Sequence, residues 1–477
     1  MKVLNYTYIL LLIAALVSCK KLEEKPASVF TTDQFYKTQE DAIAAVNSIY
    51  QGGLNNGGIT MYNRLFHLGM EIMSDDAIAG QRVTNADVRS IAVLNHSTTN
   101  DRVDELWKEH YIAINRANIA IDRIPLIDMD ATLRARLVNE AKFLRGLLYF
   151  NLVRLWGEVP LVLHEVTSLN PSSIHVAKSP VETIYTQVIT DLIDAEKLPP
   201  VMGGADAGRA TGGAAKSILA KVYLTRKEWE KAAAKSLEVI NGPYGYDLFE
   251  DYADVFKAET KNGKEHIFSA QCKSFVNGQG NRLASSATPV GIPGIAAAGT
   301  DEPLLPSTYA LYAANDKRRD VTFFTQIVSP TNGKVYKFDP RFFKYFDPST
   351  ATNPTESPRN VPVIRFAEVL LIYAEAVNEA TGPGGAYEAI NRVRKRAGLD
   401  PLSGLDQSSF REAVYLERRL ELMFEFQRWF DLIRTKRMIS ALHAVGKTNA
   451  TEKHYLHPIP QREIDLNPKL EQNDLWK

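Results

Sequence analysis

The amino-acid sequence predicts an all-α-dominated protein in which degenerate helical repeats support a large irregular, loop-rich part with minor β structure. Two observations indicate the helical frame: apolar residues recur at three- and four-residue steps, and small alanines accompany Tyr and Trp in paired segments. A third indicates the irregular part, because Gly and Pro accumulate over residues 261–362 and helical periodicity fades there. The 477 residues are 45% hydrophobic, which is ample for a large core.

An apolar run, Ile9 to Val17, follows Lys2 at the N-terminus. It is too short to span a bilayer and has the length of a signal-peptide core. It leads into Leu16-Val17-Ser18-Cys19, which resembles a bacterial lipobox. Residues 1–18 are therefore predicted to be a lipoprotein signal peptide, with Cys19 acylated and anchoring the chain to a membrane. An ordinary secretory signal and a buried hydrophobic helix are the alternatives.

Residues 19–37 are predicted to be the lipid anchor and its tether. The charged stretch Lys20-Lys21-Leu22-Glu23-Glu24-Lys25-Pro26 is typical of a solvated tether, and it also resembles acidic signals that direct lipoproteins to the cell surface. Both interpretations remain open.

Charge and cysteine content exclude several classes of protein. Lys plus Arg and Asp plus Glu each number 56, the formal net charge is +0, and no long basic run is present. Nucleic-acid binding is therefore disfavoured, because phosphate contacts need clustered cations. With Cys19 acylated, Cys272 has no disulfide partner and is expected to be a small buried residue.

The most regular helix is predicted over residues 137–155, where apolar residues cover so many positions that the helix should be buried on much of its girth. It should stop at Trp156-Gly157, with Pro160 beyond, which is the expected order of a helix end. This helix, begun at residue 132, is predicted to pair with a helix over residues 103–124, and a further helix is predicted over residues 180–197.

Two more helix pairs are predicted over residues 211–241 and 366–397. The first turns around Arg226-Lys227, and its small alanines beside Tyr223 and Trp229 resemble a tetratricopeptide unit, in which small residues let two helices approach closely. The second turns at Gly382-Pro383-Gly384-Gly385. No strict register connects the pairs, so the repeats are degenerate.

The middle of the chain, residues 261–362, is predicted to be irregular, with short β-rich pieces such as Val321-Thr322-Phe323-Phe324-Thr325. Residues 51–100 form a second, shorter irregular region. Long irregular segments inside a compact domain are commonly functional.

Motifs in order along nearly the whole chain resemble those of the SusD/RagB family. They are Trp107 with Tyr111 and Ile114-Asn115-Arg116-Ala117-Asn118, the block 140–161, Gly208-Arg209-Ala210-Thr211, Asn315-Asp316-Lys317-Arg318, the block 362–376, the block 417–432, and Tyr455-Leu456-His457-Pro458-Ile459-Pro460. Their order and spacing, together with the lipobox, are more specific than any single motif.

This resemblance implies a SusD-like N-terminal helical-repeat region at residues 38–245 and a RagB/SusD C-terminal region at 246–477. It implies a non-enzymatic lipoprotein on the outside of the cell outer membrane that captures oligosaccharides for nutrient uptake. A SusC-like TonB-dependent transporter is the implied partner, over which the lipoprotein acts as a lid. The alternatives are peptide ligands on the same architecture, a surface glycan hydrolase, and a helical scaffold that binds only proteins.

Ligand contacts are expected from the irregular regions, because the helices commit their aromatic residues to packing. Sugar sites combine an exposed aromatic face with paired polar side chains. The candidates are Asp75, Asp76, Arg82, Asn95 and His96 in the first region, and Phe275, Asn277, Gln279, Asn281 and Arg282 in the second. Ser74-Asp75-Asp76 also matches a recurrent family segment, for which a structural role is the alternative. The residues expected to pack inside the helical frame are Trp107, Trp156, Trp229 and Trp429.

A cluster of charges at residues 417–428 admits two interpretations. Glu417, Glu421 and Glu425 lie four apart on one helix face, beside Arg418, Arg419 and Arg428. We expect a semi-buried ion network between helices rather than paired acids for glycoside hydrolysis.

No cofactor or metal site is expected from the sequence. His454 and His457 are three residues apart but lack the other ligands of a metal site.

Overall fold

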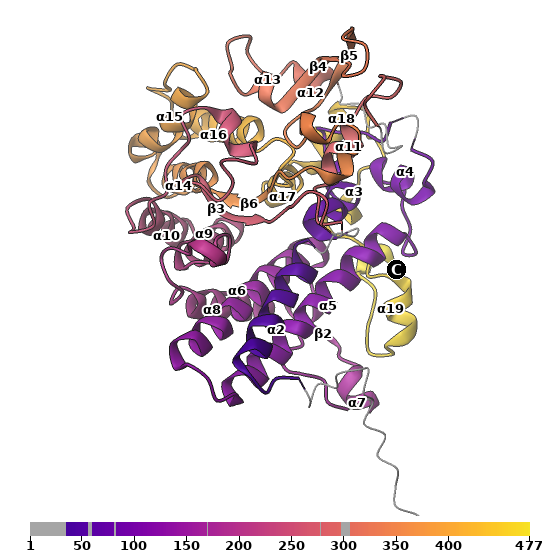
Figure 1. Ribbon diagram of the computed structural model, residues 1–477, viewed down its shortest axis with the longest axis vertical. Coiled ribbons are helices and arrows are strands. Elements are labelled where there is room, and N and C mark those ends of the chain that lie inside the picture. Colours follow the sequence, from indigo (N-terminus) through magenta and orange to yellow (C-terminus); the bar gives the residue numbers. More distant parts are fainter. Residues whose placement is uncertain (1–34, 56–59, 81–82, 169, 277, 297–305) are drawn as a thin grey trace, which may run out of the picture.

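A computed structural model (Figure 1) describes residues 35–55, 60–80, 83–168, 170–276, 278–296 and 306–477, and helices dominate these ranges. The predicted signal peptide and Cys19 lie outside the described residues. The helices of seven or more residues are α2 (Gln39–Gly53), α4 (Ala86–Ala92), α5 (Asp101–Arg123), α6 (Ala131–Trp156), α8 (Val181–Ala195), α9 (Gly212–Thr225), α10 (Trp229–Ile240), α14 (Phe366–Thr381), α15 (Tyr387–Arg396), α16 (Gln407–Glu421), α17 (Arg428–Arg434) and α18 (Met438–Ala444). The shorter ones are α3 (Phe66–Gly69), α7 (Pro171–Ile174), α11 (Leu283–Ala287), α12 (Pro306–Tyr309), α13 (Arg319–Thr322) and α19 (Gln461–Leu466).

Helix α6 is the centre of the N-terminal frame, where it packs against α5 on one side and α8 on another, while α2 packs on α5. Asp130 caps its first turn by accepting a hydrogen bond from the Leu133 amide. It ends at Trp156 because Gly157 adopts φ +74, a conformation that a residue with a Cβ adopts at a cost. The prediction of a deeply buried helix ending at Trp156-Gly157 is confirmed.

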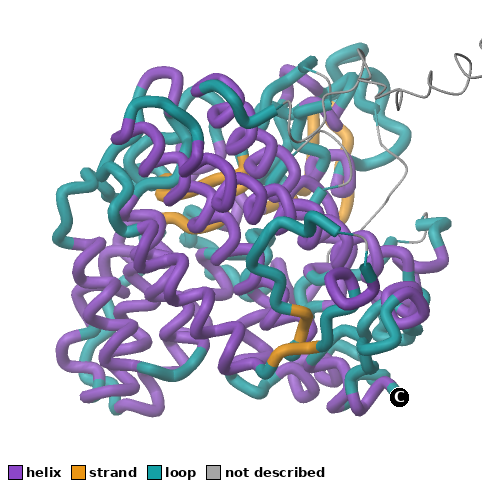
Figure 2. Tube along the Cα trace, turned by 90° about the horizontal axis from the view of Figure 1, so that it is seen from below, coloured by secondary structure: helices purple, strands orange, loops and turns teal. Residues whose placement is uncertain are grey.

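The predicted helix pairs are confirmed as α9 with α10 and α14 with α15. Helices α9 and α10 pack together, and α14 crosses both, so that the repeat frame continues into the C-terminal half. Buried alanines such as Ala214, Ala215 and Ala232 allow this close packing. In Figure 1, α2, α5, α6 and α8 lie in the lower part of the molecule, with α9 and α10 above them and α14 and α15 higher still. Figure 2 shows from below that helices make up most of the molecule.

The described residues contain three short antiparallel strand pairs. Strand β1 (Val159–Pro160) pairs with β2 (Lys178–Ser179), β3 (His266–Ala270) with β6 (Val361–Arg365), and β4 (Phe323–Val328) with β5 (Val335–Phe342). The β3–β6 pair is buried at every position and joins the two ends of the irregular segment. The β-rich piece predicted at 321–325 forms the start of β4 and the last turn of α13.

The irregular segment lies above the helical frame in Figure 1, where β4, β5, α11, α12 and α13 gather. This arrangement fits the predicted loop-rich part at residues 261–362. The segment 51–100, also predicted to be irregular, instead contains the short helices α3 and α4. No helix among the described residues has both the length and the apolar character needed to cross a membrane.

Candidate ligand-binding surface

The two irregular regions that the sequence singles out meet in space, through a chain of asparagine hydrogen bonds. Asn55 Nδ2 donates to the carbonyl oxygens of Gln271 and Gln279, both at 3.1 Å. Asn63 Nδ2 donates to Asn55 Oδ1 and to the Gly280 carbonyl, and Asn63 Oδ1 accepts from the amide of Arg282 at 2.7 Å. Residues 271–276 and 278–282, called the stapled loop below, are therefore fixed to Asn55 and Asn63.

A second set of contacts holds the stapled loop to residues 355–359. The amide of Asn281 donates to the Ser357 carbonyl at 2.7 Å, and Asn281 Nδ2 donates to the Arg359 carbonyl at 2.9 Å. A Cβ on Gly280 would come within 2.4 Å of the Glu356 Cα, so only glycine allows this close approach. The loop is thus held from both sides by backbone and buried amide contacts.

Phe275 is presented to solvent at the tip of the stapled loop, where its side chain is 69% exposed. Its backbone has φ +55, and its amide donates to Glu356 Oε2 at 2.8 Å, which holds this unusual conformation. A large apolar ring held in water by a rigid loop offers a flat face on which a sugar ring can stack.

The neighbouring predicted residues have different environments. Gln279 and Arg282 of the stapled loop are half-buried, whereas Asn281 is fully buried. The expectation that Asn281 contacts a ligand directly must be corrected, because all of its side-chain polar atoms serve the loop: its Oδ1 accepts from the Leu283 amide at 2.8 Å. Asn95 is exposed after α4, and Arg82 and Asn277 lie outside the described residues.

Asp75 and Asp76 are buried and bound by arginines of the C-terminal helices. Arg428 Nε and Nη2 each donate to Asp75 at 2.8 Å, and Arg419 donates to Asp76 Oδ1 at 2.9 and 2.6 Å. Burial alone would raise the pKa of Asp75, but the hydrogen bonds and charge of Arg428 outweigh it and hold that pKa below its ordinary value. Both carboxylates therefore have the structural role that was the alternative for Ser74-Asp75-Asp76: they bind Arg419 and Arg428. Direct contact with a ligand, which the sequence suggested for them, is not what their side chains do in this structure.

Lys447 reinforces the same segment. Its Nζ donates to the carbonyl oxygens of Ile72, Ser74 and Ala77 at 2.7, 2.6 and 2.7 Å. One buried ammonium therefore closes the turn that carries Asp75 and Asp76.

His96 lies inside the molecule and not at the expected ligand surface. Its ring centroid is 5.8 Å from those of His454 and His457 and 5.1 Å from that of Trp476. Burial, and then the neighbouring histidines, keep the pKa of His96 well below its ordinary value, so the ring is neutral at pH 7. Among the described residues, no group of three or more His, Cys, Asp or Glu side chains has a geometry that could hold a metal ion.

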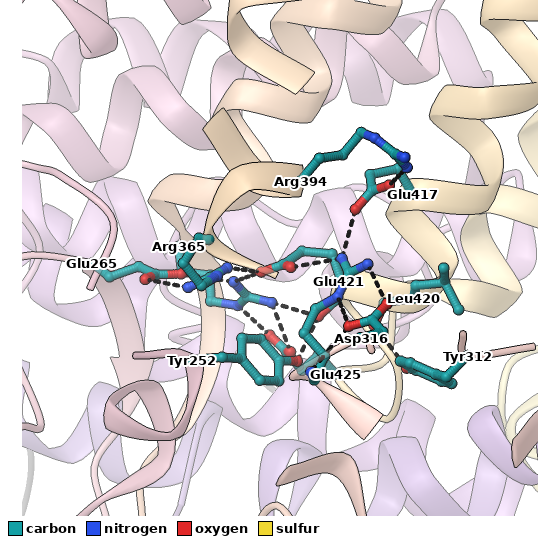
Figure 3. A network of polar contacts seen from close by, with 12 residues as sticks. Tyr252, Glu265, Tyr312, Asp316, Arg365, Arg394, Glu417, Leu420, Glu421 and Glu425 are labelled. Atoms are coloured by element: carbon teal, nitrogen blue, oxygen red, sulfur yellow. Dashed lines mark hydrogen bonds and ion pairs between the residues drawn. The ribbon is translucent and has the colours of Figure 1, made fainter. Parts of the chain in front are cut away.

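Glu417 and Glu421 of α16 and Glu425, which follows the end of that helix, form the ion network shown in Figure 3. The expectation that the three acids share one helix face is wrong, because α16 ends at Glu421, but all three carboxylates are buried, more deeply than expected. Arg365 is the centre of the network: it donates to Glu265 at 2.8 Å, to Glu421 at 2.5 Å and to both oxygens of Glu425 at 2.8 and 3.0 Å. Arg318 donates to Glu417, Glu421 and Asp316 at 2.6 to 3.0 Å. The other cations are Lys344 on Glu425, Arg394 on Glu417, and Arg396 on Glu265 and Glu421.

This network binds the irregular segment to the helical frame. Arg318, Lys344 and Arg365, which bind Glu417, Glu421 and Glu425, come from the irregular segment and from β6. Arg418, which is adjacent to Glu417 in the sequence, pairs with Asp431 and Glu368 instead. Burial would raise the pKa of Glu421, but Arg396, Arg365 and Arg318 together hold it well below its ordinary value. Carboxylates that are buried, ionised and bound on several sides cannot donate or take protons at a substrate.

The tryptophans and Cys272 pack as the sequence predicts. Trp107, Trp156 and Trp429 are buried, and Trp229 is half-buried on α10. Cys272 is free and buried, and burial raises its pKa to about 12, so its thiol is unreactive.

Sequence reasoning did not single out Asn55, Asn63 or Glu356, although they hold the stapled loop. Their position in the irregular regions was the only indication in the sequence. It was not enough, because an asparagine or glutamate in a loop can bind water, a ligand or the backbone, and the sequence does not distinguish these.

Family models, a sequence relative and two solved structures that resemble this chain are described as SusD-like or as starch-binding proteins of the outer membrane. A family model described as "SusD family" matches residues 325–476, and one described as "Starch-binding associating with outer membrane" matches residues 22–224. SusD-like protein P2 of Formosa agariphila is 31% identical, covering 99% of this chain and 99% of its own. Among solved structures, a laminarin-binding SusD-like protein is 26% identical and covers 92% of this chain and 100% of its own, with a TM-score of 0.78. A SusD superfamily protein from Parabacteroides distasonis is 28% identical and covers 94% and 100%, with a TM-score of 0.81.

Proposed function

Because the chain belongs to the SusD family, we propose that it is a non-enzymatic lipoprotein that captures oligosaccharides outside the cell and delivers them to a SusC-like TonB-dependent transporter. The observation that supports glycan binding most directly is the exposed ring of Phe275 on the stapled loop. A relative with 26% identity is named for laminarin binding, which favours glycans over peptides as the ligand class.

The hydrolase alternative is weakened by the ion network. The closely spaced acids that might have served as an acid–base pair are buried with their arginine partners. Hydrolysis of a bound oligosaccharide by the purified protein would nevertheless overturn the proposed function.

Replacing Phe275 by alanine is expected to weaken oligosaccharide binding about tenfold, because a stacked aromatic ring contributes ~1.4 kcal/mol. Stability should change by less than about 0.5 kcal/mol, since the side chain is exposed. Isothermal titration with laminarihexaose and maltohexaose measures the first effect, and thermal unfolding measures the second.

Leu126→Ala is the matched control for Phe275→Ala, because Leu126 is 83% exposed on the turn after α5. It should leave binding unchanged. Equal affinities for wild type, Phe275→Ala and Leu126→Ala would place the glycan elsewhere, and saturable binding of peptides but not glycans would favour the peptide alternative.

The membrane anchor and the transporter partner can be tested together. Mild detergent extraction of tagged protein from cell membranes should recover a large outer-membrane transporter in near-equal amount. The Cys19→Ser variant lacks the thiol that carries the lipid and should leave the membrane fraction and lose acyl labelling. Recovery of the protein alone would count against the partner, and unchanged labelling of Cys19→Ser would count against the anchor.

A further inference from the structure

A cleft of about 810 Å³ lies at the C-terminal end of the chain, away from the stapled loop. The cleft is bounded by residues 157–158 before β1, by Lys178 of β2 and by the start of α8. Its other walls are Lys436 and residues from the ranges 452–456 and 471–476. In Figure 1 the C-terminus and β2 lie beside the lower helices, whereas α11, β4 and β5 lie at the top. The volume is within the range of about 300–1,000 Å³ that is typical of small-molecule pockets.

One wall of this cleft, called the C-terminal cleft below, is held rigidly. Trp476 Nε1 donates to the carbonyl oxygens of Lys453 and Leu456, both at 3.0 Å. Asn473 Nδ2 donates to the carbonyl oxygens of Trp156 at 3.1 Å and His457 at 2.8 Å. Asn473 thus bonds this wall to the end of α6, and Trp476 bonds it to residues 453 and 456 on the facing side, so the shape of the cleft is fixed before any ligand binds.

The side chains facing the C-terminal cleft combine apolar surface with polar groups that the protein leaves available. Tyr455, Leu456, Leu475 and Trp476 provide the apolar surface. In the part of the chain that the structure describes, the Tyr455 hydroxyl and the side chains of Glu452 and Lys436 make no hydrogen bond or ion pair. Lys453 also lacks a carboxylate partner there, and its ammonium lies 4.5 Å from the centroid of the Trp476 ring.

The charges around the C-terminal cleft nearly cancel, which limits the chemistry of its ligand. The lysines that line it are Lys178, Lys436 and Lys453, and the acids are Glu158, Glu452, Glu471 and Asp474. Glu471 and Asp474 also pair with Lys477, so the cations and acids at the cleft are equal in number and give an anionic glycan no electrostatic advantage. The hydroxyls of a neutral sugar both donate and accept, so they can bond to either sign of charge while the apolar ring face packs on Tyr455 or Leu475.

From these features we propose that the C-terminal cleft is a second binding site for neutral oligosaccharides, an inference that rests on the proposed glycan-binding function. A polymer that reaches from the stapled loop to the cleft would be held at two points. Once the polymer is bound at one site, its binding at the second site no longer depends on diffusion from solution. The protein should therefore bind a long chain more tightly than a hexasaccharide.

The test uses the double variant Tyr455→Phe/Glu452→Leu, which removes one hydroxyl and one carboxylate from the cleft at similar side-chain size. The matched control is Tyr223→Phe/Glu230→Leu on α9 and α10, and Phe275→Ala removes the other site. Each protein is titrated with a panel of neutral hexasaccharides, including laminarihexaose and maltohexaose, and with the polymer laminarin. Thermal unfolding verifies that every variant is folded.

Wild type should bind two hexasaccharides, and the cleft variant should bind one of them at least tenfold more weakly. The control should match wild type, and polymer affinity should fall in both the cleft variant and Phe275→Ala. One binding site that responds to Phe275→Ala but not to the cleft variant overturns this inference and leaves the proposed function intact. Absence of any glycan binding overturns both, and binding of peptides in the cleft overturns the assignment to sugars.

Discussion

Arg365→Met is expected to lower the free energy of unfolding by about 3–5 kcal/mol, because it leaves buried carboxylates without their main partner. Arg365 donates to Glu265, Glu421 and Glu425 and is itself buried. Methionine keeps much of the side-chain volume but none of the charge. Urea unfolding at pH 7 measures the effect. The stability of Arg365→Lys should lie between those of wild type and Arg365→Met, because lysine keeps the charge but lacks the planar guanidinium.

The control for Arg365→Met is Arg437→Met, which breaks an ion pair with Glu412 at the surface. The side chains of Arg437 and Glu412 are 41% and 56% exposed, so the cost should be below about 1 kcal/mol. Similar small effects for both variants would show that the buried network does not depend on the charge of Arg365.

The effect of Arg365→Met should also depend on pH. The surrounding cations hold the pKa values of Glu421 and Glu425 below those of an unfolded glutamate, which is about 4.3. The wild-type network therefore stabilises the fold fully above that pH and loses its contribution as the pH falls further. The difference between wild type and Arg365→Met should shrink in acid, and a difference that grew there would contradict this account.

Trp156→Ala is expected to cost about 3–5 kcal/mol, because it removes one of the largest side chains of the core and leaves a cavity. Trp156 is fully buried, donates from Nε1 to the Pro458 carbonyl at 2.9 Å, and packs against Trp107 with the two rings nearly perpendicular. Chemical unfolding measures the cost. Titration with hexasaccharides, under conditions in which the variant stays folded, should show unchanged affinity at the stapled loop.

Trp229→Ala is the comparison for Trp156→Ala, since Trp229 is half-buried and should cost clearly less. The two variants separate the effect of burial from that of removing an indole ring. If Trp156→Ala remained as stable as wild type but lost the ligand, the binding site would lie on the helical frame and not on the loops.

The helical frame follows directly from local sequence patterns. The apolar stripes of α6, α9, α10 and α14 have the helical period, and Gly157 and Gly382 mark ends that the structure shows. These signals are local, because a stripe of side chains on one helix is set by spacing within a few turns of chain. The same reasoning placed Trp107, Trp156 and Trp429 in the interior.

Only the tertiary structure decided which polar residues serve the fold and which face solvent. Asp76 and Phe275 both lie in irregular segments, yet Asp76 is buried against Arg419, 343 residues further along the chain, whereas Phe275 is exposed. Likewise, Glu421 is bound by Arg318 and Arg365, and not by the arginines adjacent to it in the sequence.

The physical reason for this division is the range of the interactions. A helix is specified by hydrogen bonds and side-chain contacts between residues three or four apart, so its pattern can be read from the sequence. A buried ion pair joins whichever oppositely charged groups the folded chain brings together, and Asp, Glu and Arg look the same in the sequence whether they bind a ligand or one another. The sequence by itself therefore determined the repeat helices and the family, and the tertiary structure decided that Asp75, Asp76, His96 and Asn281 belong to the interior and Phe275 to the surface.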